Sequence, residues 1–365
     1  MNRLSSQRGF VLALTLWTLT AMTVAAGFFA LWTQNVLHRA HQEQQDVRAL
    51  VEMSSTQATI LYFFAVQHIT LAGLSVPVPP EVTENTSSVP VKPKKGLGSL
   101  EDEQRGVMPS GGEIALDDTV YMGLGRARFS IQDKRGLLAV NYVGSAQISS
   151  LLGLLGVPAG ERSILTDRLL DYTDKDDLVR LNGAESADYV HAGLSPPPNR
   201  LLLTSWEARN VLGWKDRAEL WESGRFARLT TVTSGSIPNL NTAPELVLKT
   251  IPGVDDVTAR RIMNVRRKVP FNTLGAIDRA AGKYLNIEVM GLALLPSANE
   301  RITLWCEGGK RMKEIHVQLM PRGNWKTPWL IDHVLTLPLT SEQESAHAQP
   351  VSTPLFAPPV SANSN

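Results

Sequence analysis

An acidic stretch in the middle of the chain has the residue types that bind a hard cation. The segment "LLDYTDKDDLVRLNGAESADYV" contains the carboxylates of Asp171, Asp174, Asp176, Asp177 and Glu185. Calcium prefers six to eight oxygen ligands, and a flexible acidic segment can supply several of them. These five residues are therefore candidate calcium ligands.

The acidic segment matches the EF-hand calcium loop only in part. Four residues fall on ligand positions of that template: Asp174, Asp176, Asn182 and Glu185. Leu178 replaces a further ligand, and Val179 replaces the glycine that the sharp turn of an EF-hand requires. The segment is therefore not an EF-hand; a solvated acidic turn between two helices is the simpler interpretation, and a calcium-bound loop is the alternative. Paired carboxylates also suit a glycosidase, but no accompanying motif supports that activity.

A second informative stretch, "IPNLNTAPELVLKTIPGVDDVTARRIMNVRRKVPF", has the pattern of a helix-hairpin-helix. Thr242 precedes Glu245 by three residues, as in a capping box, and this spacing predicts a helix that begins near Ala243. The apolar turn from Ile251 to Val254 then leads into a second helix. Such hairpins often bind DNA, because a glycine turn and a helix N-terminus let a phosphate approach closely.

The charges around this turn favour a structural role over DNA binding. Asp255 and Asp256 follow the turn directly, and carboxylates there repel a phosphate. Five basic residues spread around the second helix instead of lining the turn: Arg260, Arg261, Arg266, Arg267 and Lys268. The whole chain has 36 basic and 35 acidic residues, so no global excess favours a nucleic-acid partner. A membrane-tethered DNA-binding or DNA-uptake protein is kept as the alternative function.

No other pattern indicates catalysis. The sequence lacks the nucleophile-elbow, zinc-protease and phosphate-loop motifs, and its seven histidines are scattered. The single cysteine, Cys306, excludes an intramolecular disulfide and is predicted to be a small buried side chain in a strand. We predict that the protein is not an enzyme, and a single-pass periplasmic enzyme remains a rival class.

The N-terminal segment is long and apolar enough to cross a membrane. Residues 10–37 contain no Asp, Glu, Lys or Arg, and a helix of that length spans a bilayer core of about 30 Å. Arg3 and Arg8 precede it, which places the N-terminus in the cytoplasm and the rest beyond the membrane. A secretory signal would have a shorter apolar region.

The helical pattern continues past the membrane segment. Apolar or small residues recur at intervals of three or four: Leu37, Ala40, Val47, Leu50, Ser54, Ala58, Leu61, Ala65, His68 and Ala72. This spacing predicts one continuous helix over residues 10–74, which ends near Gly73 and the prolines that follow.

The rest of the chain divides by composition into an α+β arrangement. We predict a loop at 75–118, strands at 119–145, a helical block at 146–290, further strands at 291–340 and a disordered tail at 341–365. The stretch "GRARFSIQDKRGLLAVNYV" is predicted to form a β-hairpin. Its candidate core residues are Phe129, Ile131, Leu138 and Val140. The N-terminal helix would pack on a small antiparallel sheet, with the helical block inserted between its strands.

The start of the chain resembles the signature of type IV prepilins and pseudopilins, in which a basic leader ends in glycine. On that resemblance residues 1–9 are a leader, prepilin peptidase cuts between Gly9 and Phe10, and the new amino group of Phe10 is methylated. Most pilins carry a glutamate at the fifth mature position, where this chain has Leu14. A subunit without that carboxylate cannot pair with the terminus of a neighbour, which suits a position with no subunit above it.

Taken together, these stretches resemble the K-type minor pseudopilins of type II (general) secretion systems. The acidic segment and "IPNLNTAPELVLKTIPGV" carry most of the resemblance. It implies a pilin-like fold with a large inserted α-domain, bound calcium, and a position at the pseudopilus tip with I-type and J-type minor pseudopilins and other pseudopilins. It also implies a single-pass inner-membrane protein whose C-terminal domain lies in the periplasm and faces the secretin or exported proteins.

Overall fold

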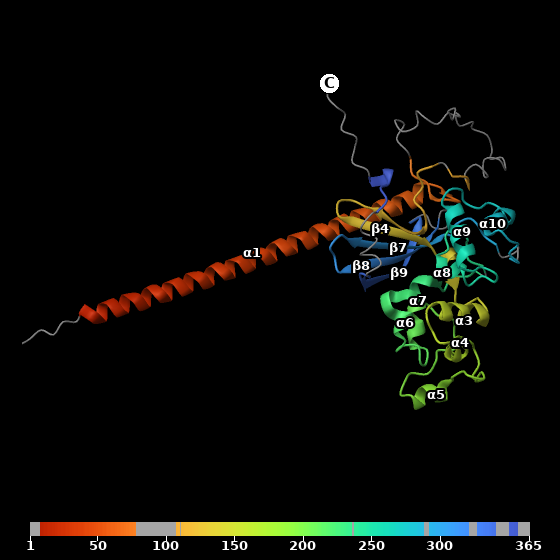
Figure 1. Cartoon of the computed structure of the whole chain (residues 1–365), viewed down its shortest axis with the longest axis horizontal. Helices are drawn as coiled ribbons and strands as arrows, with labels where there is room; N and C mark the ends of the chain where they lie inside the picture. Colours follow the sequence, from red (N-terminus) through yellow and green to blue (C-terminus); the bar gives the residue numbers. More distant parts are fainter. Residues whose placement is uncertain are drawn as a thin grey trace, which may run out of the picture.

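The computed structural model describes residues 8–77, 107–109, 111–235, 237–287, 292–320, 327–340 and 350–356. Its longest element is α1 (Arg8–Val66), which extends far beyond the folded part of the molecule (Figure 1). Side chains from Val11 to Leu50 lie almost entirely exposed. By length and composition, α1 is the one helix in the described part of the chain that could cross a membrane.

The helix ends earlier than its sequence pattern predicts. After Val66 the chain forms two short strands, β1 (Ile69–Thr70) and β2 (Gly73–Leu74), instead of continuing to Gly73. Gly73 has a φ of 139°, and a Cβ there would lie 2.1 Å from the carbonyl oxygen of Ile114. Leu74 and Ile114 exchange two backbone hydrogen bonds of 2.9 Å. This tertiary pairing gives the backbone partners that a longer helix would otherwise provide.

The face of α1 that packs on the sheet also differs from the predicted one. Thr56, Ile60 and Phe64 are buried, whereas Ser54 and Ala58 of the predicted face are exposed. Leu61 of the predicted face is buried as well, so the two faces overlap near that residue. The small residues gave a regular spacing, but the larger apolar side chains determine which face meets the sheet.

The central sheet has five antiparallel strands in the order β3-β4-β7-β8-β9. The strands are β3 (Asp117–Met122), β4 (Ala127–Asp133), β7 (Asn299–Cys306), β8 (Arg311–Leu319) and β9 (Trp329–Pro338). β4 and β7 are adjacent although most of the helices separate them in sequence. Phe129 and Ile131 of β4 are fully buried under α1, and Cys306 is buried at the end of β7, as predicted.

The predicted hairpin around "QDKRG" is wrong. A short 3-10 turn, η2 (Lys134–Gly136), leads from β4 into β5 (Leu138–Ala139), which leaves the sheet. β5 pairs in parallel with β6 (Thr230–Thr231). Leu138 and Val140 are buried as predicted, but they lie in the core of the helices and not in that of the sheet. The alternating pattern identified buried residues without specifying which partner covers them.

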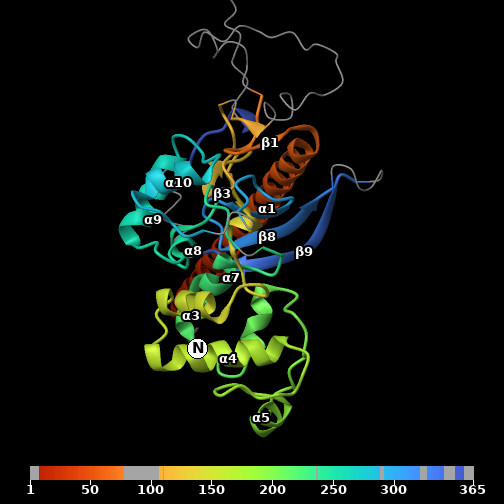
Figure 2. The same ribbon diagram turned by 90° about the vertical axis from the view of Figure 1, so that its right-hand side faces the viewer.

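A helical region, defined here as residues 145–281, lies between β5 and β7 and projects to one side of the sheet (Figures 1 and 2). Its α-helices are α3 (Ser145–Leu154), α4 (Ala159–Thr173), α5 (Ser186–His191), α6 (Ala218–Trp221), α7 (Arg225–Leu229), α8 (Glu245–Leu248), α9 (Asp256–Arg266) and α10 (Leu274–Ala281). Two 3-10 turns, η3 (Ser205–Asn210) and η4 (Glu222–Gly224), lie among them. The α+β architecture with inserted helices is therefore confirmed.

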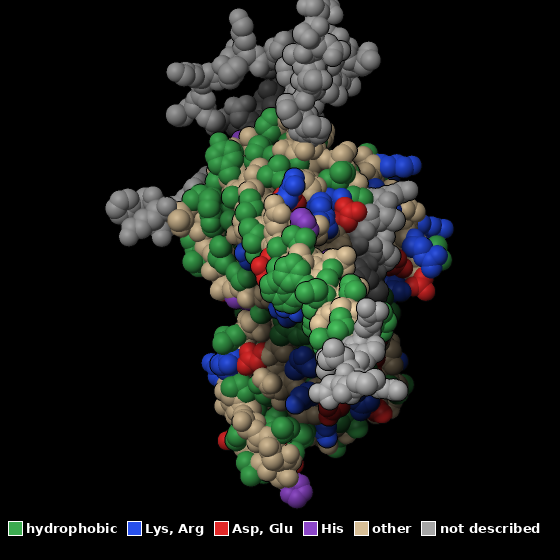
Figure 3. Space-filling view, turned by 90° about the vertical axis from the view of Figure 1, so that its left-hand side faces the viewer, with side chains coloured by type: hydrophobic (Ala, Val, Ile, Leu, Met, Phe, Trp, Pro, Cys, Tyr) green, Lys and Arg blue, Asp and Glu red, His purple; other side chains and the backbone are tan. Residues whose placement is uncertain are grey.

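The molecule has two hydrophobic cores. One lies between α1 and the sheet and includes Ile60, Phe129 and Ile315; the other fills the helical region around Trp214 and Tyr189. Seen along α1, the surface has an upper lobe and a lower lobe with a constriction between them (Figure 3).

Part of the predicted disordered tail is ordered. Val351 pairs with Tyr121 at the edge of β3, and Phe356 of η6 (Pro354–Phe356) packs against the ring of Phe129 with a centroid distance of 5.6 Å. The apolar side chains of this segment explain its order, because they bury area against the sheet. Residues 341–349 and 357–365, and residues 78–106 of the predicted loop, lie outside the described part.

Candidate functional site

The acidic segment links α4 to α5 at the end of the helical region that lies far from the sheet (Figures 1 and 2). α4 packs on the helical core through Leu165 and Leu169, and it ends at Thr173 because Asp174 adopts an extended backbone. Glu185 is the N-cap residue of α5, and the carboxylate of Asp188 accepts a 3.0 Å hydrogen bond from its backbone N–H. Two packed helices therefore fix both ends of the segment.

Asp171 organises the loop from the inside. Its side chain is fully buried, and Oδ2 accepts hydrogen bonds from the backbone N–H groups of Arg180 (3.2 Å) and Ala184 (2.9 Å). A Cβ at Gly183 would lie 1.7 Å from that oxygen, so only glycine lets the backbone approach so closely. Asp167 accepts two further hydrogen bonds, from the backbone and side chain of Asn182.

Glu185 is a buried carboxylate whose charge is not balanced locally. Only 4% of the residue is exposed, and apart from the backbone N–H of Asp188, which the side chain faces in a capping box, its carboxylate oxygens have no donor among the described residues. Burial, followed by the nearby negative charges of Asp171 and Asp174, raises the pKa of Glu185 to about 7. Asp174 Oδ1 is likewise buried without a partner, and burial raises the pKa of Asp174.

The guanidinium of Arg180 provides the positive charge at this cluster. Its Nε lies 3.0 Å from Asp171 Oδ1, and its Nη2 lies 3.1 Å from Asp174 Oδ2. The arginine side chain is nearly half exposed, so it can leave without unfolding the core. Arg180 therefore balances two of the three central carboxylates and leaves Glu185 without an ion pair.

The remaining two predicted ligands are engaged elsewhere. Asp176 Oδ1 accepts a hydrogen bond from the backbone of Leu178, and Asp177 Oδ1 accepts one from the side chain of Asn199, both at 3.0 Å. No group of three or more His, Cys, Asp or Glu side chains in the described part of the chain has an arrangement ready to hold a metal. The structure thus brings Asp171, Asp174 and Glu185 into one electrostatic cluster, with Asp176 and Asp177 at its periphery.

The unpartnered oxygens fit a divalent cation. Buried carboxylate oxygens without donors are costly, and a hard cation such as calcium would satisfy them. Asp174 Oδ1 and both oxygens of Glu185 are available for this role, and Asp171 would contribute once Arg180 turned away. The oxygens are of the type that calcium binds, but in this loop conformation no three of the described carboxylates are grouped as a metal site, and Arg180 lies at the cluster.

The predicted helix hairpin is present, but its first helix is a single turn. α8 begins at Glu245 after Pro244, and the hydroxyl of Thr242 donates to Asp133 at 2.8 Å instead of capping the helix. The predicted capping box is therefore wrong, because the polar junction with the sheet binds Thr242. At the second helix, Asp255 Oδ1 accepts a 2.8 Å hydrogen bond from the backbone N–H of Thr258.

These contacts do not favour DNA binding. The carboxylate of Asp255 already occupies the N-terminus of α9, where a phosphate would have to bind. Arg266 is buried and donates to the carbonyl oxygens of Leu240 and Ala243, so its charge is directed inward. Ile251 and Val254 pack into the helical core, as the structural interpretation predicts, while Pro252 and Gly253 between them are exposed.

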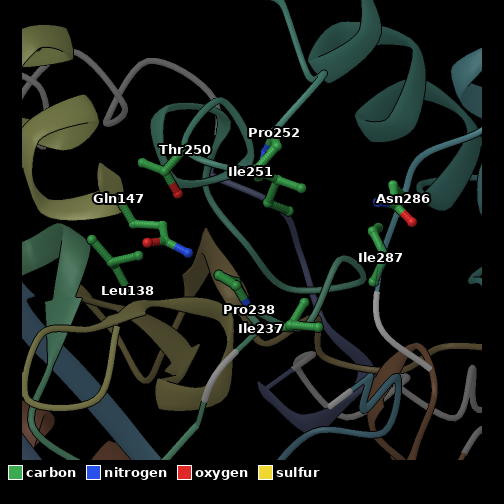
Figure 4. A pocket seen from close by; sticks show the side chains of 9 residues that line it. All are labelled: Leu138, Gln147, Ile237, Pro238, Thr250, Ile251, Pro252, Asn286 and Ile287. Carbon is green, nitrogen blue, oxygen red and sulfur yellow. The ribbon is translucent and has the colours of Figure 1, made fainter. Parts of the chain in front are cut away.

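A pocket of about 240 Å³ lies beside the same turn (Figure 4). Leu138 and Gln147 line one side of the pocket. Residues 250–252 line it from the turn, and Asn286 and Ile287 lie across from them. Among the described residues that line it, no side chain titrates, and the Thr250 hydroxyl donates to the carbonyl oxygen of Val247. The pocket thus offers no acid, base or free nucleophile for catalysis.

A buried polar junction between sheet and helices was missed in the sequence. Asp133 accepts hydrogen bonds from Asn239, Thr242 and Ser297, which lie more than a hundred residues away in the chain. Asp118 accepts from Arg228 and Arg301, both at 3.2 Å. Burial alone would raise the pKa of Asp118, but these guanidinium groups outweigh it and lower the pKa to about 2. No local spacing could reveal contacts between segments so distant in sequence.

The predicted processing residues lie at the start of α1. Gly9 and Phe10 are in its first helical turns, and their cleavage and methylation stay predictions. Leu14 lies on the exposed part of α1, with 53% of its surface accessible. An apolar side chain at that depth suits a lipid environment, whereas an unpaired carboxylate would be costly.

Together, these features define a pilin-like class of protein: a long apolar N-terminal helix packed on an antiparallel sheet, with helices inserted between the strands. Residues 130–219 match the family model described as type II secretion system (T2SS), protein K. The match covers 90 of the 365 residues, agrees with the predicted resemblance to the K-type minor pseudopilins, and supports a minor pseudopilin of the type II secretion system.

The chain also matches solved structures, of which one is described here. This matching structure is the crystal structure of the GspK-GspI-GspJ complex from the enterotoxigenic Escherichia coli type 2 secretion system. The matched chain has 14% sequence identity and a TM-score of 0.46, and the match covers 82% of this chain and 99% of that chain. A comparison with curated proteins gives no match.

Proposed function

We propose that this chain caps the tip of the type II pseudopilus and helps to initiate its assembly for export of folded proteins across the outer membrane. The observation that carries this proposal is the position of the helical region, which projects laterally from the sheet at one end of α1 (Figure 1). In a filament of packed helices, such a region obstructs a subunit that would stack above it. The absence of a carboxylate at Leu14 supports the same position.

The protein is proposed to act as a structural component with no catalytic step. Prepilin peptidase would cut between Gly9 and Phe10, and α1 would hold the protein in the inner membrane with its N-terminus in the cytoplasm. The sheet and helical region would lie in the periplasm, where the helical region faces the secretin or exported proteins. The apolar surface of α1 supports this topology, because its exposed side chains need either lipid or neighbouring helices.

We infer that the I-type and J-type minor pseudopilins are its partners. This inference rests on the protein K match, together with the protein K resemblance of the sequence.

We also propose that the acidic cluster binds calcium. Asp171, Asp174 and Glu185 would hold the ion, with Asp176 and Asp177 as peripheral ligands, and Arg180 would leave the cluster. The unpartnered oxygens of Glu185 support this assignment. A ligand that binds only the folded state stabilises it by about 2.7 kcal/mol at about one hundred times its Kd. The melting temperature in calcium should therefore be higher than the melting temperature in chelator, and equal values would contradict a calcium site.

Labelling of assembled pseudopili tests the tip position. The full chain carries a C-terminal epitope, and gold particles are located on filaments that contain it together with the other pseudopilins. We expect label at one end only, while an epitope on the major subunit labels the whole length. Label from this chain along the filament would overturn the proposal.

A further inference from the structure

A guanidinium group lies between the carboxylates of the acidic loop, at the place where a metal ion would bind. Nη2 of Arg180 donates a 3.1 Å hydrogen bond to Asp174 Oδ2, and Nε lies 3.0 Å from Asp171 Oδ1. One planar side chain therefore bridges two carboxylates that would otherwise repel each other.

The contact of Arg180 with Asp171 is an ion pair without the alignment of a hydrogen bond. Asp171 is fully buried, yet its Oδ1 has no hydrogen-bond donor in the described part of the chain. The other oxygen, Oδ2, already accepts from the backbone N–H groups of Arg180 and Ala184. Since charge-assisted hydrogen bonds are the strong ones, a bare ion pair at Oδ1 is the weaker hold, and another cation can replace it.

Arg180 brings too little positive charge for the carboxylates around it. It contributes one charge to Asp171, Asp174 and Glu185, and no ion pair reaches Glu185 in the part of the chain that is described. Calcium carries two charges and takes about six to eight oxygen ligands, which suits three carboxylates better. The two cations exclude each other, because they would use the same oxygens of Asp171 and Asp174 and would repel at that distance.

Little apolar packing holds the segment that carries Arg180. Leu178, Val179 and Leu181 are 77%, 58% and 96% exposed, so no apolar side chain next to Arg180 belongs to the core. A segment with few buried apolar contacts can rearrange at low cost. The guanidinium can therefore turn out to solvent while α4 and α5 keep their places.

We propose that Arg180 is a built-in competitor of calcium. Its guanidinium balances Asp171 and Asp174 in the calcium-free loop, and the ion binds these carboxylates only after the guanidinium has turned away. This competition rests on the proposed calcium site and names the residue that sets its affinity. It explains why no three of the described carboxylates are grouped as a metal site in the conformation that holds the arginine.

A competitor of this kind sets the calcium concentration at which the loop fills. The ion binds only the arginine-free form, so the apparent Kd rises as that form becomes rarer. Cytosolic calcium sensors have Kd values of about 0.1–10 μM, whereas extracellular modules have values of about 0.1–1 mM. A site weakened by Arg180 would therefore fill only in a compartment richer in calcium than the cytoplasm.

Titration calorimetry with calcium measures the competition. The full chain in detergent is stripped of metal with a chelator, transferred to buffer without chelator and titrated with calcium chloride. Arg180→Gln removes the competing charge, so we expect its Kd to be at least about tenfold lower than that of the original chain. Arg180→Lys keeps the charge but lacks the fork that spans both carboxylates, so its Kd should lie between the two.

Arg200→Gln is the matched control for the loss of one positive charge. Arg200 pairs with Glu207 at 2.8 Å in the same region, and its side chain is 44% exposed, compared with 45% for Arg180. Calcium should bind Arg200→Gln with the Kd of the original chain.

Thermal melts give a second and independent measurement. In chelator, Arg180→Gln leaves Asp171 and Asp174 without their counter-charge, so its melting temperature should be lower than that of the original chain. In saturating calcium this difference should disappear, because both chains then hold the ion and Arg180 lies in solvent. A melting temperature in chelator that is equal to or above that of the original chain would contradict the role of Arg180.

The outcomes separate the competition from the calcium site itself. Equal Kd values for the original chain and Arg180→Gln would overturn the competition alone. Calcium binding by neither chain would overturn the proposed calcium site, and the competition with it. A similar fall in Kd for Arg200→Gln would show that net charge, and not the position of Arg180, sets the affinity, and would also overturn the competition.

Discussion

At the scale of single residues, the buried carboxylate of Glu185 accounts for most of the unfavourable electrostatic free energy of the acidic loop. Arg180 balances Asp171 and Asp174, but in the described part of the chain Glu185 has no ion pair, and its carboxylate faces only the backbone N–H of Asp188. A bound proton or a bound cation removes the cost of such a buried negative charge. Stability and calcium binding should therefore both depend on the protonation of this one residue.

Glu185→Gln should remove a pH dependence that the original chain shows. The folded pKa is about 7 and the ordinary value is 4.5, so without calcium the folded state holds a proton that the unfolded state releases in this range. The free energy of unfolding should then fall as pH rises from about 4.5 to about 7. Urea unfolding in chelator measures this slope, and Glu185→Gln should reduce it.

Calcium should act in the opposite direction at the same residue. The ion binds the deprotonated carboxylate, so its stabilisation should increase as pH rises through about 7 and should largely disappear in Glu185→Gln. Glu222→Gln, an exposed carboxylate of the same region, is the matched control and should behave like the original chain. A calcium effect that survives unchanged in Glu185→Gln would contradict the assignment.

His316 should make the protein less stable in acid. It stacks on His333 with a centroid distance of 3.9 Å, and burial, with Lys134 and His333 nearby, lowers the pKa of His316 to about 4 despite a 2.7 Å contact with Glu314. The unfolded imidazole takes up a proton near its ordinary value of 6.5, so stability should be lost as pH falls from about 6.5 to about 4.

The His316→Gln variant isolates this contribution. Its free energy of unfolding should depend less on pH across that window than that of the original chain, as measured by urea titrations at several pH values. His191→Gln, at an exposed site on α5, is the control. Equal pH profiles for His316→Gln and the original chain would show that the surroundings do not lower the pKa of His316.

The sequence predicted the acidic cluster at residue level but not its internal order. Residue types alone could place Asp171 to Glu185 in one acidic segment, in which Asp171 belongs to the last turn of α4 and Asp174 to the loop that follows. They could not indicate that Arg180 turns inward, because its orientation depends on how α4 and α5 hold the ends of the loop. The ligand set therefore required tertiary information.

At the scale of elements, the attachment of the helical region to the sheet depends on long-range ion pairs. Asp118 of β3 binds Arg228 of α7 and Arg301 of β7, while its Oδ1 accepts a 2.7 Å hydrogen bond from Ser130. Arg301 is nearly fully buried, so its charge depends on this carboxylate. The pairing couples three elements that are far apart in sequence.

Asp118→Asn should therefore destabilise the fold by about 3 kcal/mol, the usual cost of leaving a buried charge without its partner. Asparagine tolerates the φ of 65° at this position as well as aspartate does, so the change is mainly one of charge. Urea unfolding of the full chain in detergent measures the loss. Asp216→Asn, at an exposed site, should change stability by less than about 0.5 kcal/mol.

Elements with strong local patterns were predictable, and their partners were not. α4 and α9 follow their apolar spacing, and β4, β7 and β8 follow their alternation. The predicted hairpin after β4 does not form because β5 pairs with β6, ninety-two residues further along. α1 ends before the predicted residue because Leu74 pairs with Ile114. In both cases a non-local backbone contact replaced the local structure that the pattern indicated.

At the scale of the whole molecule, the helical region and α1 have separate tasks in the proposed assembly. α1 supplies an apolar surface for lipid or neighbouring helices, and the laterally placed helical region restricts what can lie above it (Figure 1). The α+β plan was predictable because each part has its own composition. The mutual placement of sheet and helices was not, because it depends on the buried junction around Asp133.

Leu14→Glu tests whether the side chain or the shape determines the tip position. The variant restores the carboxylate that most pilins carry, but the helical region still obstructs stacking. We expect gold label from Leu14→Glu at one filament end, as for the original chain, and label along the filament would show that Leu14 alone excludes it. Leu19→Glu, another exposed position of α1, controls for adding a carboxylate to the apolar helix.

Mass spectrometry of the mature N-terminus tests the pseudopilin assignment most directly. The full chain is purified from inner membranes of cells that contain prepilin peptidase, and its N-terminal peptide is identified. We predict a chain that begins at Phe10 with a methylated amino group, and a chain that keeps residues 1–9 in cells lacking the peptidase. An intact Met1 in the presence of the peptidase would contradict the assignment.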